Sequence, residues 1–210
     1  MRALFQISGR FRRIAFVLVP IAIFALFVSA CQAGWSTVEG ADGARYAVPP
    51  GWKALVGEEA KKKQQEGMRM LPENIRSLAL MPDLAFIAYR GDNMLAVYSQ
   101  PTGFDMGIIS SLFGELVDVY QHALEMMGQE LEKNSNGAIR LKVGEIRKAE
   151  APDDPDVLAS LEATFQITMN NRELPVRSKL LVYRNRLVNI VATNNAPLDE
   201  FLRRSSLRSR

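Results

Sequence analysis

Few residues of this chain are of the kinds that usually perform chemistry. Cys31 is the only cysteine and His122 the only histidine among 210 residues. A Ser-His-Asp triad would have to use His122, but no G-x-S-x-G segment supplies its nucleophile. Structural zinc sites need four Cys or His ligands, and the chain has only these two. We therefore predict no catalytic residue, no metal site and no cofactor, and expect the protein not to be an enzyme.

Three other groups of side chains could bind ions or lipids. The acidic loop 152–156 could hold calcium, but it lacks the spaced oxygen donors and distal glutamate of an EF-hand. Methionine pairs such as Met126 and Met127 could bind copper(I), although methionine more often fills gaps in a core. Lys61–Lys63 could bind phosphate or lipid headgroups, yet the glutamates around them favour a solvated helical face. We expect these groups to be structural.

Cys31 ends a segment that predicts export from the cytoplasm. Residues 1–13 contain four arginines and no acidic residue, and the following run, Ile14–Ala30, is almost wholly apolar. This order, closed by small side chains, is typical of a secretory signal peptide. A membrane-spanning helix normally needs about 20 apolar residues. The run is slightly short for that, and Pro20 would kink it.

The last residues of that segment, Val28–Cys31 (VSAC), resemble the lipobox of bacterial lipoproteins. The resemblance implies that Cys31 is the lipid attachment site and becomes the first residue of the mature chain. Residues 1–30 are then the signal peptide, 31–37 a lipidated tether and 38–210 the domain. The alternative is an uncleaved single-pass anchor. Either way we expect the domain to lie outside the cytoplasm, in the bacterial cell envelope, because short positive segments stay inside.

The distribution of charge argues against a nucleic-acid partner. The chain has 26 basic and 23 acidic residues, but the first 30 residues hold four arginines and no acids, which leaves 22 against 23. Four more arginines lie in the last eight residues, so residues 31–202 have 18 basic and 23 acidic side chains. Proteins that bind nucleic acid present concentrated basic surface. We expect none here.

Hydrophobic periodicity predicts an antiparallel sheet with flanking helices. Alternation predicts strands, and apolar residues at spacings of three or four, from Ile109 to Met127, predict a long helix that Asp105 caps. The predicted strands are 45–56 (interrupted by Pro49 and Pro50), 84–90, 94–100, 139–146, 161–169, 174–184 and 187–193, and the predicted helices are 58–66, 72–80, 106–133 and one that starts at Pro197. Runs of strands and helices in this order indicate the α+β class.

One short motif points to a family. Tyr46, Val48, Pro49, Gly51 and Trp52 resemble the Y-x-V-P-x-G-W segment of PsbP-like domains, which include extrinsic photosystem subunits and many bacterial lipoproteins. The resemblance implies an antiparallel sheet flanked by helices, in a family used mostly for binding and assembly.

Together these features predict a membrane-anchored envelope lipoprotein with a PsbP-like domain. We expect the domain to bind a protein partner as an accessory or assembly factor, and the lipid on Cys31 to hold it at a membrane. Two alternatives remain open. The domain could carry a small apolar or metal ligand between its sheet and its long helix, or the chain could be an uncleaved single-pass membrane protein.

Overall fold

The computed structural model describes residues 34–40, 42–69, 83–108, 114–151, 154–169 and 171–207. The chain divides into two units, Met1–Trp35 and Ser36–Arg210, and all described helices and strands belong to the second. The predicted signal peptide, Cys31 and the predicted helix at 72–80 lie outside the described residues.

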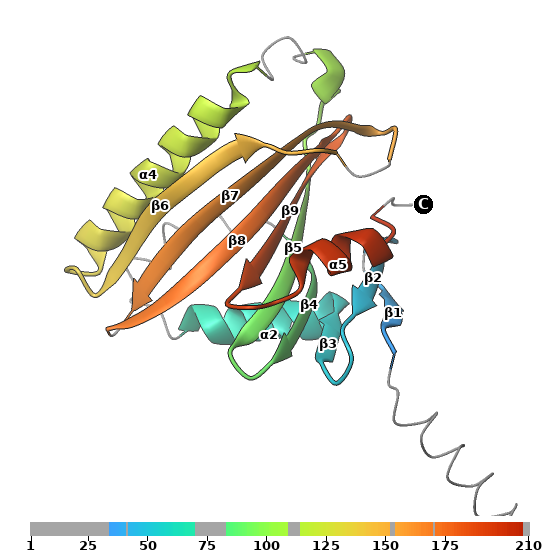
Figure 1. The fold of residues 1–210 in the computed structure, drawn as a ribbon, viewed down its shortest axis with the longest axis horizontal. Coiled ribbons are helices and arrows are strands. Elements are labelled where there is room, and N and C mark those ends of the chain that lie inside the picture. Colours follow the sequence, from blue (N-terminus) through green and yellow to red (C-terminus); the bar gives the residue numbers. More distant parts are fainter. Residues whose placement is uncertain are drawn as a thin grey trace, which may run out of the picture. The chain divides into compact units, whose positions relative to one another are not determined.

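A seven-stranded antiparallel sheet forms the centre of the second unit, with the strand order β3-β4-β5-β9-β8-β7-β6 (Figure 1). Its strands are β3 (Lys53–Val56), β4 (Leu84–Arg90), β5 (Asn93–Pro101), β6 (Ile139–Lys148), β7 (Val157–Met169), β8 (Arg172–Tyr183) and β9 (Arg186–Thr193). Two further strands, β1 (Ser36–Glu39) and β2 (Arg45–Val48), pair with each other in a small separate sheet.

Local sequence explains most of these strands. Gly91, in the left-handed conformation at φ 58°, turns the chain between β4 and β5. In β6 the pairing with β7 shifts between Val143 and Ile146, and Gly144 lies at the shift. A Cβ at Gly144 would lie 3.0 Å from the carbonyl oxygen of Thr164, so glycine permits this bulge.

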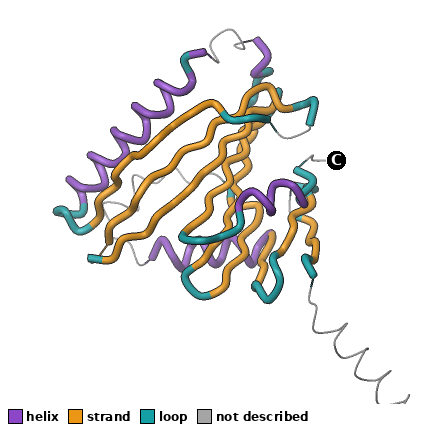
Figure 2. The backbone as a smooth tube through the Cα atoms, viewed as in Figure 1, coloured by secondary structure: helices purple, strands orange, loops and turns teal. Residues whose placement is uncertain are grey.

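Three described helices flank the sheet: α2 (Gly57–Arg69), α4 (Leu116–Asn134) and α5 (Leu198–Arg204). Figure 2 shows α2 behind the sheet and α5 in front of it. Ala60 of α2 packs against Ile87 and Ala96, whereas Phe201 of α5 packs against Phe86, which points to the opposite face of β4. Helix α4 lies along the edge strand β6. None of the described helices is both long and apolar enough to span a membrane.

The core on the α5 side is built around three aromatic rings. The ring centroids of Tyr46 and Phe86 are 4.9 Å apart, and those of Phe86 and Phe201 are 5.7 Å apart. All three side chains are fully buried. The Tyr46 ring therefore fixes the small β1-β2 sheet, and the Phe201 ring fixes α5, to the same point of the main sheet.

The structure corrects two sequence expectations. The long helix α4 begins at Leu116 and not at 106; at residues 106–108 the chain forms a 3₁₀ turn, in which the Asp105 carboxylate accepts the Gly107 N–H at 2.7 Å. β1 already begins at Ser36, inside the expected tether. The segment after α5 pairs with β2, since Arg45 and Ser206 exchange two backbone hydrogen bonds of 2.8 Å.

Candidate functional site

Residues that the sequence singled out for chemistry are scattered over the domain. His122 lies exposed on α4. The three lysines of α2 behave as a solvated face, since Lys61 pairs with Glu58 at 3.4 Å and Lys63 with Glu66 at 3.6 Å. Asp154 accepts a hydrogen bond from the Tyr183 hydroxyl at 3.3 Å. Among the described residues, no group of three or more His, Cys, Asp or Glu side chains could hold a metal ion.

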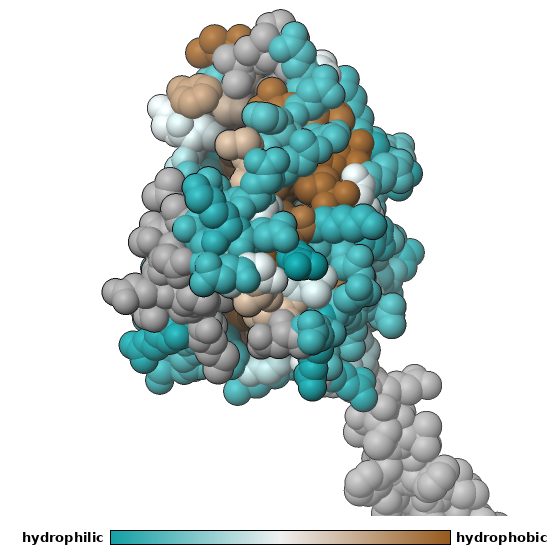
Figure 3. Space-filling model, turned by 90° about the vertical axis from the view of Figure 1, so that its left-hand side faces the viewer, coloured by the Kyte–Doolittle hydropathy of each residue, from teal (hydrophilic) through white to brown (hydrophobic). Residues whose placement is uncertain are grey.

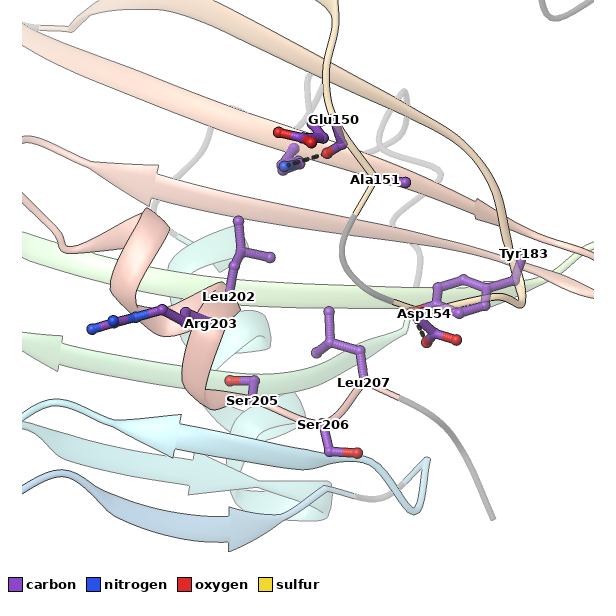
Figure 4. A pocket seen from close by; sticks show the side chains of 10 residues that line it. Glu150, Ala151, Asp154, Tyr183, Leu202, Arg203, Ser205, Ser206 and Leu207 are labelled. Carbon is purple, nitrogen blue, oxygen red and sulfur yellow. Dashed lines mark hydrogen bonds between the residues drawn. The ribbon is translucent and has the colours of Figure 1, made fainter.

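One cavity of about 470 Å³ opens on the face of the sheet that α5 covers. Figure 4 shows its walls: Glu150 and Ala151 after β6, Tyr183 at the end of β8, side chains of α5, and the segment that follows α5. The residues that line the cavity are Glu150, Ala151, Asp154, Lys179, Tyr183, Leu202, Arg203, Ser205, Ser206 and Leu207.

Two cationic side chains that line this cavity already have partners. Lys179 Nζ donates to the Glu150 carbonyl at 3.0 Å, and Arg203 is paired with Glu200. Its mixed charges do not suit a small apolar ligand. The cavity also lies on the opposite face from Tyr120 of α4, which contacts Ser178 at 3.5 Å, so it is not the expected space between sheet and long helix.

Arg186 holds the C-terminal segment against this wall. Arg186 is only 7% exposed, its Nη2 donates to the Leu207 carbonyl, and its guanidinium lies 4.6 Å from the centre of the Tyr183 ring. Nη1 lies 3.6 Å from Oδ2 of Asp42, to which the Tyr46 hydroxyl also donates at 2.6 Å. Burial, and then the hydrogen bond to Asp42, raise the pKa of Tyr46 above its usual range. This network could not be predicted from the sequence, where Arg186 falls between the predicted strands 174–184 and 187–193.

A second charged group crosses the same face of the sheet. Glu162 Oε1 accepts from Arg177 at 2.8 Å, and Glu162 Oε2 accepts from Arg147 at 3.2 Å. Arg177 also donates to both carboxylate oxygens of Asp199 in α5, at 3.1 Å each. These residues connect β6, β7, β8 and α5, so we assign them a structural role.

The outer side of α4 carries exposed apolar side chains. Leu124 and Gly128 are buried, but Val119, Met126 and Met127 have 61%, 47% and 46% of their surface exposed. The view onto the side where α4 lies in Figure 1 shows hydrophobic side chains grouped among hydrophilic ones (Figure 3). The apolar pattern in the sequence includes Val119 and Met127. The pattern does not show that the apolar side chains extend around more of the helix than the side that the sheet covers. Exposed apolar groups of this kind are typical of binding surfaces.

Comparison with known proteins identifies the fold. The solution structure of cyanobacterial PsbP (CyanoP) from Synechocystis sp. PCC 6803 matches with a TM-score of 0.51 and 10% identity, over 84% of this chain and 94% of that one. A protein of unknown function from Pseudomonas aeruginosa, described as a putative regulator, matches with a TM-score of 0.31 and 10% identity, over 79% and 85% of the two chains. No protein-family model and no curated protein matches. The domain therefore has the predicted PsbP-like α+β fold.

Proposed function

We propose that this chain is a bacterial envelope lipoprotein whose domain binds a protein partner as an accessory or assembly factor and catalyses no reaction. In this proposal residues 1–30 are a signal peptide and Cys31 carries the lipid. The domain stays close to the membrane outside the cytoplasm, since the few residues between Cys31 and β1 reach at most about 3.5 Å each.

The membrane anchor is supported by the position of the only cysteine. Cys31 follows Val28, Ser29 and Ala30 directly at the end of the apolar run. A lone thiol in an exported protein has no partner within its chain and tends toward intermolecular pairing. Lipidation would remove that thiol and explain why the run ends in small residues.

Partner binding is supported by the exposed apolar side chains of α4. Val119 is the observation that carries this part of the proposal, because 61% of its surface is exposed in the first turn of a regular helix. By contrast, Arg177 and Arg186 are paired with carboxylates in structural networks, and Lys179, which lines the cavity beside α5, donates to the Glu150 carbonyl. A binding role therefore accounts for more of the described surface than a catalytic one.

Site-specific photo-cross-linking in cells tests the binding role. A photoreactive amino acid is placed at one exposed position in each of three helices: Lys62 in α2, Val119 in α4 and Arg203 in α5. We expect irradiation to give a discrete adduct with an envelope protein from at least one position, and none without irradiation. Absence of adducts from all positions, together with a turnover that survives purification, would contradict a binding role.

A further inference from the structure

Four side chains on the outer side of α4 form a continuous apolar row. Leu116, Val119, Ala123 and Met126 follow one another at spacings of three, four and three residues, which places them along one line of the helix. Leu116 is half-buried, and the other three are exposed. This is the spacing with which one helix contacts another in a coiled coil. We call these four residues the α4 row.

Acidic residues close the α4 row at both ends. Glu115 precedes Leu116 directly, and Glu130 lies four residues after Met126, on the same line. Among the described residues neither forms an ion pair, and the only side-chain bond of Glu130 is with the neutral amide of Asn134, at 3.0 Å. From Glu115 to Asn134 the chain contains five acidic residues and one lysine. A partner with basic residues beside its apolar side chains would complement this surface.

We propose that the α4 row binds an amphipathic helix of another protein, with large apolar side chains at spacings of three or four and a Lys or Arg that pairs with Glu130. This inference rests on the proposed function and names the surface and the kind of partner. The apolar side chains of the partner would cover Val119 and Met126, while its cation would satisfy a carboxylate that lies in line with them.

A second copy of this chain and an anionic lipid surface fit the α4 row less well than a basic amphipathic helix. A second copy would bring two helices of net negative charge together, and like charges across an interface are unfavourable. An anionic lipid surface would be repelled in the same way. The position of the row also argues against lipid, because α4 lies along the edge strand β6, whereas β1, where the chain enters the domain, contacts β3 at the opposite edge.

Binding of synthetic helices to the full chain tests the proposal. The protein is placed in phosphatidylcholine nanodiscs, with empty nanodiscs as blanks. Fluorescence anisotropy then measures the affinity of two peptides of about 18 residues, long enough to form a helix. Both carry Leu at helical spacing, and their remaining positions are Lys in one and Glu in the other. We expect wild type to prefer the Leu–Lys peptide by about tenfold.

Matched variants distinguish binding at the α4 row from non-specific electrostatic attraction of the peptide. Val119→Glu should lower the affinity for the Leu–Lys peptide by about tenfold. Gln129→Glu adds the same charge outside the α4 row and should change this affinity by less than about twofold. Glu130→Lys should shift the preference toward the Leu–Glu peptide. Glu125→Lys makes the same change of charge on another side of α4 and should leave most of the preference in place.

Equal affinity of wild type and Val119→Glu, or equal effects of Glu130→Lys and Glu125→Lys, would overturn the proposal. The proposal would also be overturned if light scattering showed that wild type self-associates and that Val119→Glu abolishes this self-association. That result would assign the α4 row to a second copy of the chain. Binding to phosphatidylglycerol vesicles that Val119→Glu abolishes would assign it to lipid. Photo-cross-links that arise only from other helices would overturn this inference and leave the proposed function standing.

Discussion

At the scale of single residues, Arg186 has the most consequential environment in the described domain. One buried guanidinium contacts the Leu207 carbonyl, the Asp42 carboxylate and the Tyr183 ring. These partners come from three separate parts of the chain. Removing one partner of a buried charged pair usually costs more than the pair contributes, because the remaining groups keep their desolvation penalty.

Arg186→Met should therefore destabilise the fold strongly. We expect a loss of about 2–3 kcal/mol in the free energy of unfolding, measured by urea denaturation. Arg184→Met is the matched control, because Arg184 is 65% exposed and pairs only at the surface with Asp105, and it should cost less than about 0.5 kcal/mol. Equal losses in the two variants would show that the buried contacts of Arg186 contribute little.

Glu162 gives a prediction that depends on pH. Its hydrogen bond with Arg177, and a weaker contribution from Arg147, hold its pKa below the ordinary value of 4.5. A carboxyl group whose folded pKa is lowered stabilises the fold fully above its unfolded pKa, and loses that stabilisation as the pH falls through the folded pKa. Glu162→Gln should lower the free energy of unfolding by about 1–2 kcal/mol near pH 7.

The difference between wild type and Glu162→Gln should shrink as the pH is lowered from about 7 to about 3, because wild-type Glu162 then becomes neutral as well. Urea midpoints at several pH values measure this. Glu145→Gln is the control, since Glu145 is exposed and lies 4.0 Å from Arg147. A difference that stays constant over the whole range would argue against the lowered pKa.

At the scale of elements, the contact between α4 and β6 depends on a glycine. A Cβ at Gly128 would lie 3.1 Å from the carbonyl oxygen of Leu141 and 3.4 Å from its Cβ. Glycine in a helix normally costs stability, so its presence in the middle of α4 is explained by this close approach.

Gly128→Val should cost about 1–3 kcal/mol, because the added methyl groups push α4 away from β6. Gly67 in α2 is the matched control, since a Cβ there would meet nothing within 4 Å. Gly67→Ala should stabilise the protein by about 0.5–1 kcal/mol through helix propensity alone. Thermal unfolding of both variants measures the contrast, and a Gly128→Val protein as stable as wild type would rule out the close packing.

Most elements could be predicted because their signals are local. The alternation from Leu161 to Met169, and the glycine turn at Gly91, depend only on neighbouring residues, and the structure confirms both. The start of α4 and the strand β1 could not be predicted in this way. The Asp105 carboxylate closes a turn instead of capping the long helix, and β1 is held by pairing with β2.

The candidate binding surface was harder to predict than the fold. Val119 belongs to the apolar pattern that predicted the helix, and a pattern shows neither how wide a stripe the sheet will cover nor which apolar residues stay outside it. The Arg186 network could not be predicted from the sequence for a related reason. Arg186 contacts Asp42 and Leu207, which are far from it in the chain.

At the scale of the whole molecule, we propose that a lipid anchor holds the PsbP-like domain at a membrane. The domain has exposed apolar side chains on α4 at one edge of its sheet, and the chain enters at the other edge. An anchor on Cys31 would hold the domain at a membrane and leave α4 available to a protein partner there. Binding of a partner by α4 thus depends on attachment of the chain to the membrane through Cys31.

The most direct test is the intact mass of wild-type protein purified from its own membrane, beside Cys31→Ser. The account predicts that wild type begins at a diacylated or triacylated Cys31 and partitions with membranes. Cys31→Ser should carry no acyl group and should retain residues 1–30. An unmodified full-length chain in both proteins would contradict lipidation and would make Ile14–Ala30 an uncleaved anchor.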